Sequence, residues 1–220
     1  MTSPATQTDS LHKSPERRTL YAIKPAFVAA LNPLRDRLVA AGVNPDHVTL
    51  AAVPVEVAVA AALIGGTTYA AVWLLVPPLA LVWMGLNALD GSLARTTNTS
   101  TAHGAVLNEF VDRGGDLLVL GAGFLIAPVA IAATALAAVA ASEIAAAVGW
   151  AVTGERHFSG PMGKPDRAAI LAVGATVAVL WTPALTLAYL AIALGAGAGV
   201  LIRSRHVLLA AHRADRETTP

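Results

Sequence analysis

Long apolar stretches make up most of this chain and alternate with short polar connections. A helix needs about 20 apolar residues to cross a hydrocarbon core of about 30 Å. Stretches suited to this task can be placed at residues 48–66, 69–89, 104–127, 129–153, 167–181 and 183–203. The pattern predicts an all-α integral membrane protein with a bundle of six transmembrane helices.

A shorter pattern precedes the first expected span. Between residues 24 and 41, apolar side chains recur at helical spacing around Arg35, Asp36 and Arg37. This pattern indicates an amphipathic helix in the membrane interface, with a short solvated helix as the alternative. The expected organisation is a tail at residues 1–22, the amphipathic helix at 23–43, the six-helix domain at 44–206 and a second tail at 207–220.

The composition agrees with a membrane protein. Hydrophobic residues make up 55% and charged residues 13% of the chain, and the mean hydropathy is +0.62; soluble domains carry about 25% charged residues. Without cysteine, disulfides and cysteine-based metal or redox sites are excluded. A net charge of +1, with no single basic run, gives no indication of nucleic-acid binding.

The positions of lysine and arginine predict the topology. They lie in the N-terminal region up to Arg37, around Arg95 and Arg113, between residues 156 and 167, and from Arg203 onward. With six spans, these four regions share one side, and the opposite connections are uncharged. The positive-inside rule therefore predicts cytoplasmic termini, with the chain in the inner membrane of a prokaryote.

Oxygen-bearing side chains gather at the cytoplasmic ends of the second and third expected spans. They are Asn87, Asp90, Asn108, Glu109, Asp112 and Asp116. Spacings of three or four residues place each set on one helix face. Because clustered carboxylates repel one another, a divalent cation such as Mg²⁺, Mn²⁺ or Ca²⁺ would stabilise them. Polar loop residues paired with nearby arginines are the alternative.

Glycines and an arginine between these two faces favour phosphoryl transfer. Gly91 and Gly104 leave room for a substrate near the backbone, and Arg95 can neutralise a phosphate. Two other classes stay open on these residues. A small cation-dependent transporter would have acids near the bilayer midplane and repeated halves, and a noncatalytic scaffold would not require this ordered spacing.

The ordered spacing carries a family resemblance. From Asp90 to Asp112 the chain reads D-G-x-x-A-R-x8-G-x3-N-x3-D. This resembles the motif D-x-x-D-G-x-x-A-R-x8-G-x3-D-x3-D of the CDP-alcohol phosphatidyltransferase family. Residues 44–50, NPDHVTL, look like the start of that family's first span, and residues 160–167, GPMGKPDR, resemble its basic loop between spans four and five.

The resemblance implies a reaction as well as a fold. It implies a homodimer of six-helix bundles, in which a CDP-linked lipid such as CDP-diacylglycerol gives its phosphatidyl group to an alcohol and CMP leaves. Divalent cations, two Mg²⁺ or Mn²⁺ ions, would bind the pyrophosphate. The motif positions implied as metal donors are Asn87, Asp90, Asn108 and Asp112, and we add Glu109, which lies on the same expected helix, as a further candidate donor.

The resemblance also implies positions for the two substrates. Residues expected at the CDP group are Asn44, Thr49, Asp90, Gly91, Ala94, Arg95 and Gly104. Residues expected at the acceptor or its phosphate are Arg113, Arg156, Lys164 and Arg167. Asp112, or Asp116 one turn later, is the expected catalytic base.

Two positions depart from the family motif. Asn87 and Asn108 stand where the family has aspartate, and an amide offers an oxygen to a metal without a negative charge. We hypothesise that Glu109 and Asp116 restore the missing charge. A catalytically weak or inactive CDP-lipid-binding relative is the alternative. Glu143 is expected to face the cavity or pair with a basic residue, whereas Glu56 has no predicted partner.

Overall fold

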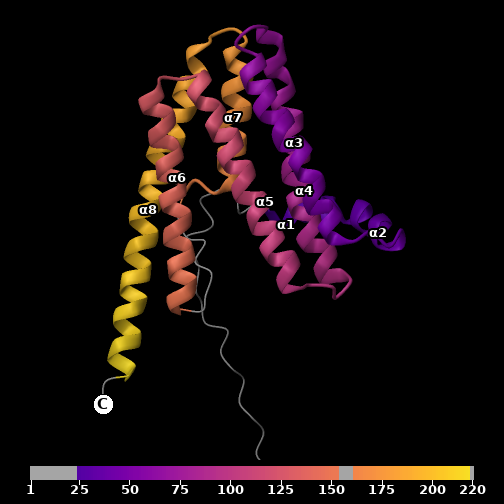
Figure 1. Cartoon of the computed structure of the whole chain (residues 1–220), viewed down its shortest axis with the longest axis vertical. Coiled ribbons are helices and arrows are strands. Elements are labelled where there is room, and N and C mark those ends of the chain that lie inside the picture. Colours follow the sequence, from indigo (N-terminus) through magenta and orange to yellow (C-terminus); the bar gives the residue numbers. More distant parts are fainter. Residues whose placement is uncertain (1–23, 154–160, 219–220) are drawn as a thin grey trace, which may run out of the picture.

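The structure, a computed structural model, describes residues 24–153 and 161–218 and is entirely helical in these ranges (Figure 1). Its eight α-helices in this part of the chain are α1 (Lys24–Ala30), α2 (Asn32–Ala40), α3 (Pro45–Gly65), α4 (Val76–Thr96), α5 (Ala102–Gly121), α6 (Val129–Thr153), α7 (Lys164–Ala178) and α8 (Pro183–Thr218). Two short 3₁₀ helices are η3 (Ala70–Leu75), before α4, and η4 (Ala122–Leu125), after α5. The predicted all-α class is confirmed.

The first long helix begins at a strong start signal. Asn44 is the N-cap of α3, and its side-chain oxygen accepts a hydrogen bond from the backbone N–H of Asp46 at 2.9 Å. Pro45 occupies the first helical position, where a missing N–H costs no helical hydrogen bond. The helix therefore starts close to the predicted beginning of the first span.

The amphipathic segment forms two short helices where one was expected. The break lies at Leu31, and Pro33 occupies the first turn of α2. Proline has no N–H for the helical ladder, and its ring clashes with the preceding turn, so the longer helix is interrupted. Leu31, Leu38 and Val39 pack against a buried cluster that includes Val48 of α3. These contacts attach the segment to the bundle.

Four helical stretches among the described residues are long and apolar enough to cross a membrane. They are Pro45–Gly65, Ala70–Thr96, Val129–Ala151 and Pro183–His212. The other two expected spans correspond to α5, which carries four charged residues, and α7, which has only 15 residues. The chain is thus a helical membrane protein, and the count of six spans stays a prediction.

The last helix continues beyond its expected end. The final span was expected to stop at residue 203 and a tail to start at residue 207, but α8 runs to Thr218. In Figure 1 the C-terminal part of α8 extends farther than the neighbouring end of α6.

The helices pack around small residues. α3 packs against α4 and α5, α7 packs against α4 and α8, and α6 packs along α8. At one crossing a Cβ added to Gly174 would lie only 2.8 Å from the Cβ of Ala188, so glycine lets α7 and α8 approach closely. Leu63, Leu185 and Ile192 are fully buried in the core between the helices.

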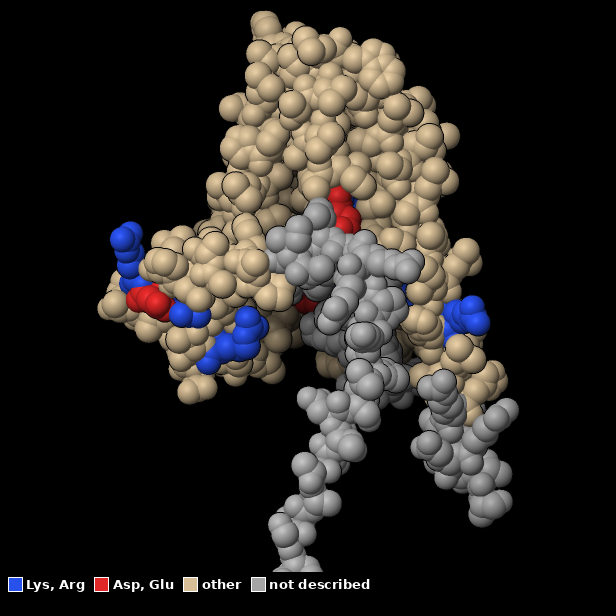
Figure 2. Space-filling view, turned by 180° about the vertical axis from the view of Figure 1, so that it is seen from behind, with Lys and Arg blue, Asp and Glu red and all other residues tan. Residues whose placement is uncertain are grey.

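The two ends of the bundle differ in charge. The connections after α3, α5 and α7 meet at the upper end in Figure 1, and residues 66–75, 122–128 and 179–182 carry no charge. In Figure 2 the charged side chains on the visible face lie below this end. This distribution is the one expected if the charged end faces the cytoplasm.

Candidate active site

The predicted motif lies on two helices joined by a tight turn at residues 97–101. Residues 87–95 belong to the end of α4, and residues 104–116 belong to α5. Asn98 reverses the chain with a φ of 53°, a left-handed conformation that asparagine tolerates better than most residues. Thr101 caps α5 by accepting a hydrogen bond from a backbone N–H three residues later, at 3.0 Å. The motif therefore starts and ends at the same end of the bundle.

Asp90 is held in place by two hydrogen bonds. The residue is 5% exposed, and its Oδ2 accepts a hydrogen bond from Oγ1 of Thr49 on α3 at 3.0 Å. Its Oδ1 accepts a hydrogen bond from the backbone N–H of Gly91 at 2.5 Å. Two residues predicted at the CDP group, Thr49 and Gly91, thus contact Asp90 directly.

Two glycines of the motif lie where side chains come close. A Cβ at Gly104 would lie 2.9 Å from Oδ1 of Asp46, so the start of α5 approaches the start of α3. A Cβ at Gly91 would lie 3.3 Å from Nη1 of Arg95, whose side chain folds back toward α4. The neighbouring ends of α3, α4 and α5 carry all seven residues predicted for the CDP group: Asn44, Thr49, Asp90, Gly91, Ala94, Arg95 and Gly104.

Asp112, the last acid of the motif, is paired with a lysine from α7. Nζ of Lys164 lies 2.6 Å from Oδ1 of Asp112 and 4.6 Å from the ring centroid of Trp83 on α4. Both charged groups lie within electrostatic reach of Asp90. Charged groups from α4, α5 and α7 therefore share one region of the protein.

The oxygen donors of the motif fit a hard divalent cation in their chemistry. In the described residues no three His, Asp or Glu side chains form a group that could hold a metal ion. The motif instead offers carboxylates from Asp90 and Asp112 and amide oxygens from Asn87 and Asn108, all suited to Mg²⁺ or Mn²⁺. Nδ2 of Asn87 is buried without a hydrogen-bond partner in the described part of the chain. This amide is therefore not committed to a protein contact through its nitrogen.

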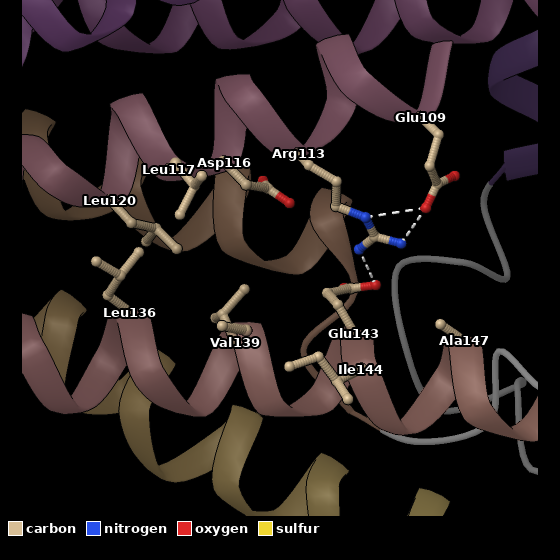
Figure 3. A pocket seen from close by; sticks show the side chains of 11 residues that line it. Glu109, Arg113, Asp116, Leu117, Leu120, Leu136, Val139, Glu143, Ile144 and Ala147 are labelled. Carbon is tan, nitrogen blue, oxygen red and sulfur yellow. Dashed lines mark hydrogen bonds and ion pairs between the residues drawn. The ribbon is translucent and has the colours of Figure 1, made fainter. Parts of the chain in front are cut away.

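The two proposed compensating acids contact arginines. Nη2 of Arg167, a residue that is 3% exposed, lies 2.5 Å from Oδ2 of Asp116. Nε of Arg113 donates to Oε1 of Glu109 at 2.9 Å, and the same guanidinium is paired with Glu143 on α6. Figure 3 shows Arg113 between the two glutamates. These contacts connect α5 to α6 and α7.

Glu143 is the residue on which the ion pairs converge. Besides Arg113, its carboxylate lies 3.5 Å from Nη1 of Arg167 and 4.0 Å from Nη1 of Arg203 on α8. Arg203 also donates to the backbone oxygen of Ser142 at 3.0 Å. The prediction that Glu143 pairs with a basic residue is confirmed.

A cavity of about 290 Å³ opens between α5 and α6 beside these ion pairs (Figure 3). Its polar end is formed by Glu109, Arg113, Asp116 and Glu143. The remaining lining is aliphatic: Leu117, Leu120, Leu136, Val139, Ala140, Ile144 and Ala147. Of the residues predicted for the acceptor, Arg113 lines this cavity, Lys164 and Arg167 pair with acids of α5, and Arg156 lies outside the described residues.

Glu56 has a partner that the sequence pattern did not predict. The residue is 2% exposed, and its Oε1 accepts a hydrogen bond from Nε1 of Trp83 at 2.6 Å. A Cβ at Gly115 on α5 would lie 2.2 Å from the Glu56 carboxyl group. The carboxylate is also within electrostatic reach of Lys164 and Asp112. Two features of the sequence could have indicated this contact: an acid within an apolar span, and the adjacent glycines Gly114 and Gly115 on α5.

Comparison with known sequences identifies the family. The sequence profile of the CDP-alcohol phosphatidyltransferases matches residues 43–201. The chain belongs to the CDP-alcohol phosphatidyltransferase family. The resemblance based on the motif of α4 and α5 is thereby confirmed at the level of the family.

Two curated proteins are similar over most of their length. The chain is 35% identical to inner membrane protein YnbA of Escherichia coli (strain K12) over 165 residues, covering 73% of this chain and 81% of YnbA. It is 30% identical to phosphatidylinositol phosphate synthase of Mycobacterium marinum (strain ATCC BAA-535 / M) over 176 residues, covering 74% and 73%. This member of the CDP-alcohol phosphatidyltransferase family is therefore an integral membrane protein.

Solved structures support the same assignment. Phosphatidylinositol phosphate synthase PgsA1 of Mycobacterium tuberculosis, in complex with manganese and citrate, matches with a TM-score of 0.65 and 25% identity, covering 80% of this chain and 88% of PgsA1. The same enzyme with CDP-DAG bound matches with a TM-score of 0.65 and 27% identity, covering 80% and 92%. The fold of this chain is thus similar to that of PgsA1.

Proposed function

We propose that the protein transfers a phosphatidyl-type group from a CDP-linked lipid, such as CDP-diacylglycerol, to an alcohol and releases CMP. The carrying observation is that the motif acids Asp90 on α4 and Asp112 on α5 lie on adjoining helices at the charged end of the bundle, and Lys164, 2.6 Å from Asp112, also lies over the Trp83 ring of α4. A membrane-embedded site at this level suits a donor whose acyl chains stay in the bilayer. CDP-DAG bound to the related PgsA1 supports the choice of donor.

The start of α3 and the end of α4 would bind the CDP group. Gly91 and Gly104 allow a close approach to the backbone, and Arg95 supplies a positive charge for nucleotide or phosphate oxygens. Thr49 fixes Asp90 through its hydrogen bond of 3.0 Å. Asn44 and Ala94 complete the proposed set.

Asp90 and Asp112, with the amide oxygens of Asn87 and Asn108, would hold the divalent cations, two Mg²⁺ or Mn²⁺ ions. When bound, such cations neutralise phosphate oxygens and lower the barrier to displacement. The manganese in the related PgsA1 structure supports this cofactor class. We leave Glu109 out of the metal set because, unlike Asp112, it lies outside the family motif, and because its carboxylate pairs with Arg113.

Asp112 is the proposed base. The acceptor hydroxyl oxygen attacks the lipid-bearing phosphorus and forms a new P–O bond, while the P–O bond to CMP breaks and its electron pair leaves with CMP. The hydroxyl proton passes to Asp112. Lys164, 2.6 Å away, positions the carboxylate. Asp116 is paired with Arg167, so we assign it to holding that arginine.

The acceptor would enter from the side of α5 on which Arg113, Lys164 and Arg167 lie. Arg156, which lies between α6 and α7 in the sequence, belongs to the same proposed set. We further propose a homodimer in the inner membrane of a prokaryote, with both termini in the cytoplasm. The charged end of the bundle, which carries the motif, supports this orientation.

The test is CMP release from CDP-diacylglycerol by the full-length protein in vesicles with Mn²⁺ and a panel of alcohols. Replacing Asp112 with Asn should lower CMP release at least about 100-fold, because it removes both a base and a metal donor. The matched control is Asp36→Asn, which removes an exposed carboxylate of α2 that pairs with Arg35. Equal rates for the Asp112→Asn protein and wild type would refute the proposed chemistry.

A CDP-lipid-binding protein with little or no turnover is the second candidate. Asn87 and Asn108 favour it, because they remove two negative charges from the motif. Under this alternative, CDP-diacylglycerol binds to the vesicle-embedded protein, but no alcohol in the panel supports CMP release.

A further inference from the structure

The three described cations that the sequence predicts for the acceptor are already paired with carboxylates of the chain. Arg113, Lys164 and Arg167 each form an ion pair with an acid of α5, and Arg113 and Arg167 also meet Glu143. A phosphorylated alcohol needs at least one cation that can turn to its phosphate. The pairing of these cations therefore bears on which alcohols the protein accepts.

The pairing of Arg167 is the most deeply buried. The side chains of Arg167 and Asp116 are 4% and 11% exposed, and Nη1 of Arg167 also donates to the backbone oxygen of Met162 at 3.0 Å. Turning Arg167 toward a phosphate would leave the Asp116 carboxylate buried without its counter-ion, which is strongly unfavourable. Both terminal nitrogens of Arg167 are thus engaged by the protein.

In the part of the chain that the structure describes, the ion pairs around Glu143 are electrically balanced. Three carboxylates, Glu109, Asp116 and Glu143, meet three guanidinium groups, Arg113, Arg167 and Arg203. The family motif specifies none of these acids. Their formal charges cancel at the polar end of a cavity whose other lining is aliphatic. Such surroundings disfavour an anionic ligand and suit one without net charge.

We propose that the acceptor is an alcohol without a phosphate group and without net charge, and that Glu109 and Glu143 exclude phosphorylated alcohols by neutralising Arg113. This inference rests on the proposed transferase function and names its acceptor class. An uncharged hydroxyl compound needs only hydrogen bonds from the site, so no arginine has to leave its carboxylate.

The direct test compares alcohols that differ by one phosphate, namely glycerol and glycerol 3-phosphate, inositol and inositol 1-phosphate, and serine and phosphoserine. Full-length protein in CDP-diacylglycerol vesicles with Mn²⁺ should release CMP at least about tenfold faster with the unphosphorylated member of a pair. A preference for phosphorylated members overturns the inference and leaves the transferase function intact. No CMP release with any alcohol overturns both.

A variant test addresses the acids themselves. Glu109→Gln keeps the shape of a half-exposed side chain and leaves Arg113 with one carboxylate instead of two. The ratio of kcat/KM for phosphorylated over unphosphorylated alcohols should rise about tenfold, because a charge-assisted hydrogen bond becomes available. Adding Arg113→Met should abolish the rise, and Asp36→Asn should not change the ratio. An unchanged ratio in Glu109→Gln protein with a normal thermal unfolding curve overturns the inference.

Discussion

Asn87 and Asn108 are the two residues at which this chain departs from its family's motif. Both keep an oxygen donor, but neither carries a charge, so the motif acids that remain are Asp90 and Asp112. Ligand charge is one of the main factors that set the affinity of a protein for a hard cation. The expected consequence is a transferase that needs more metal than one with four aspartates.

Restoring one aspartate tests this consequence. Asn87→Asp should lower the Mn²⁺ concentration for half-maximal CMP release by roughly tenfold, because a ligand gains a negative charge. The matched control is Asn98→Asp in the exposed turn between α4 and α5, which should leave the Mn²⁺ dependence as in wild type. A metal requirement that does not change in Asn87→Asp protein would remove Asn87 from the set of donors.

Two interpretations of Glu109, as a metal ligand and as a counter-ion of Arg113, predict different results for the same substitution. Sequence spacing predicts that it replaces a missing metal ligand, whereas the structure pairs it with Arg113. If it is a ligand, Glu109→Gln abolishes metal-dependent CMP release; if it neutralises Arg113, turnover persists and the acceptor preference shifts. Spacing along one helix is compatible with both roles, because Arg113 follows Glu109 by four residues, and the second carboxylate that contacts Arg113, Glu143, lies on α6.

At the level of the helices, α3 organises the site. Its first turns hold Asp90 through Thr49, and its middle packs Glu56 against the backbone of α5 at Gly115. The sequence placed the first span at residue 48 from its apolar pattern, three residues after α3 starts at Pro45, and the Asn44 cap and Pro45 are the local features that determine this start. It did not predict the Glu56 contact, which depends on how two helices cross. Pro33, in the first turn of α2, is also a local signal, and the prediction of a single amphipathic helix overlooked it.

Substitutions at two adjacent glycines of α5 test how closely α3 and α5 pack. Gly115→Ala would place a methyl group 2.2 Å from the Glu56 carboxyl group, so the free energy of unfolding should fall by about 1–3 kcal/mol. Gly114→Ala is the control, since a Cβ there would meet no atom within 4 Å beyond its chain neighbours and the backbone of its own helix, and it should be neutral or stabilising by up to about 1 kcal/mol. Thermal unfolding in detergent measures both. Equal unfolding temperatures for the two variants would contradict the close packing of α3 on α5.

For the whole molecule, the hydrophobic pattern predicted the all-α membrane class, which is confirmed, and the charge distribution predicts the orientation, which stays a prediction. Both are properties of long stretches, so errors of a few residues at helix ends do not alter them. The ion pairs among α5, α6, α7 and α8 could not be predicted. Arg167 and Asp116, for example, are 51 residues apart in the sequence and meet only in the folded bundle.

The absence of native cysteine makes the orientation easy to measure. Thr68→Cys lies in the exposed uncharged connection before α4, and Ser100→Cys lies in the exposed turn before α5. In intact cells a membrane-impermeant thiol reagent should label the first variant and not the second, because the second faces the cytoplasm. Labelling of Ser100→Cys in intact cells would place the motif on the outer side and contradict the proposed orientation.

The most direct test of the central claim is CMP release from CDP-diacylglycerol by wild-type protein in vesicles, measured with Mn²⁺ and again with EDTA. The proposed function predicts release in the presence of Mn²⁺ and an uncharged alcohol, and loss of at least about 100-fold when the metal is chelated. Release that is equally fast in EDTA, or no release with any alcohol in the panel, would contradict a metal-dependent transferase.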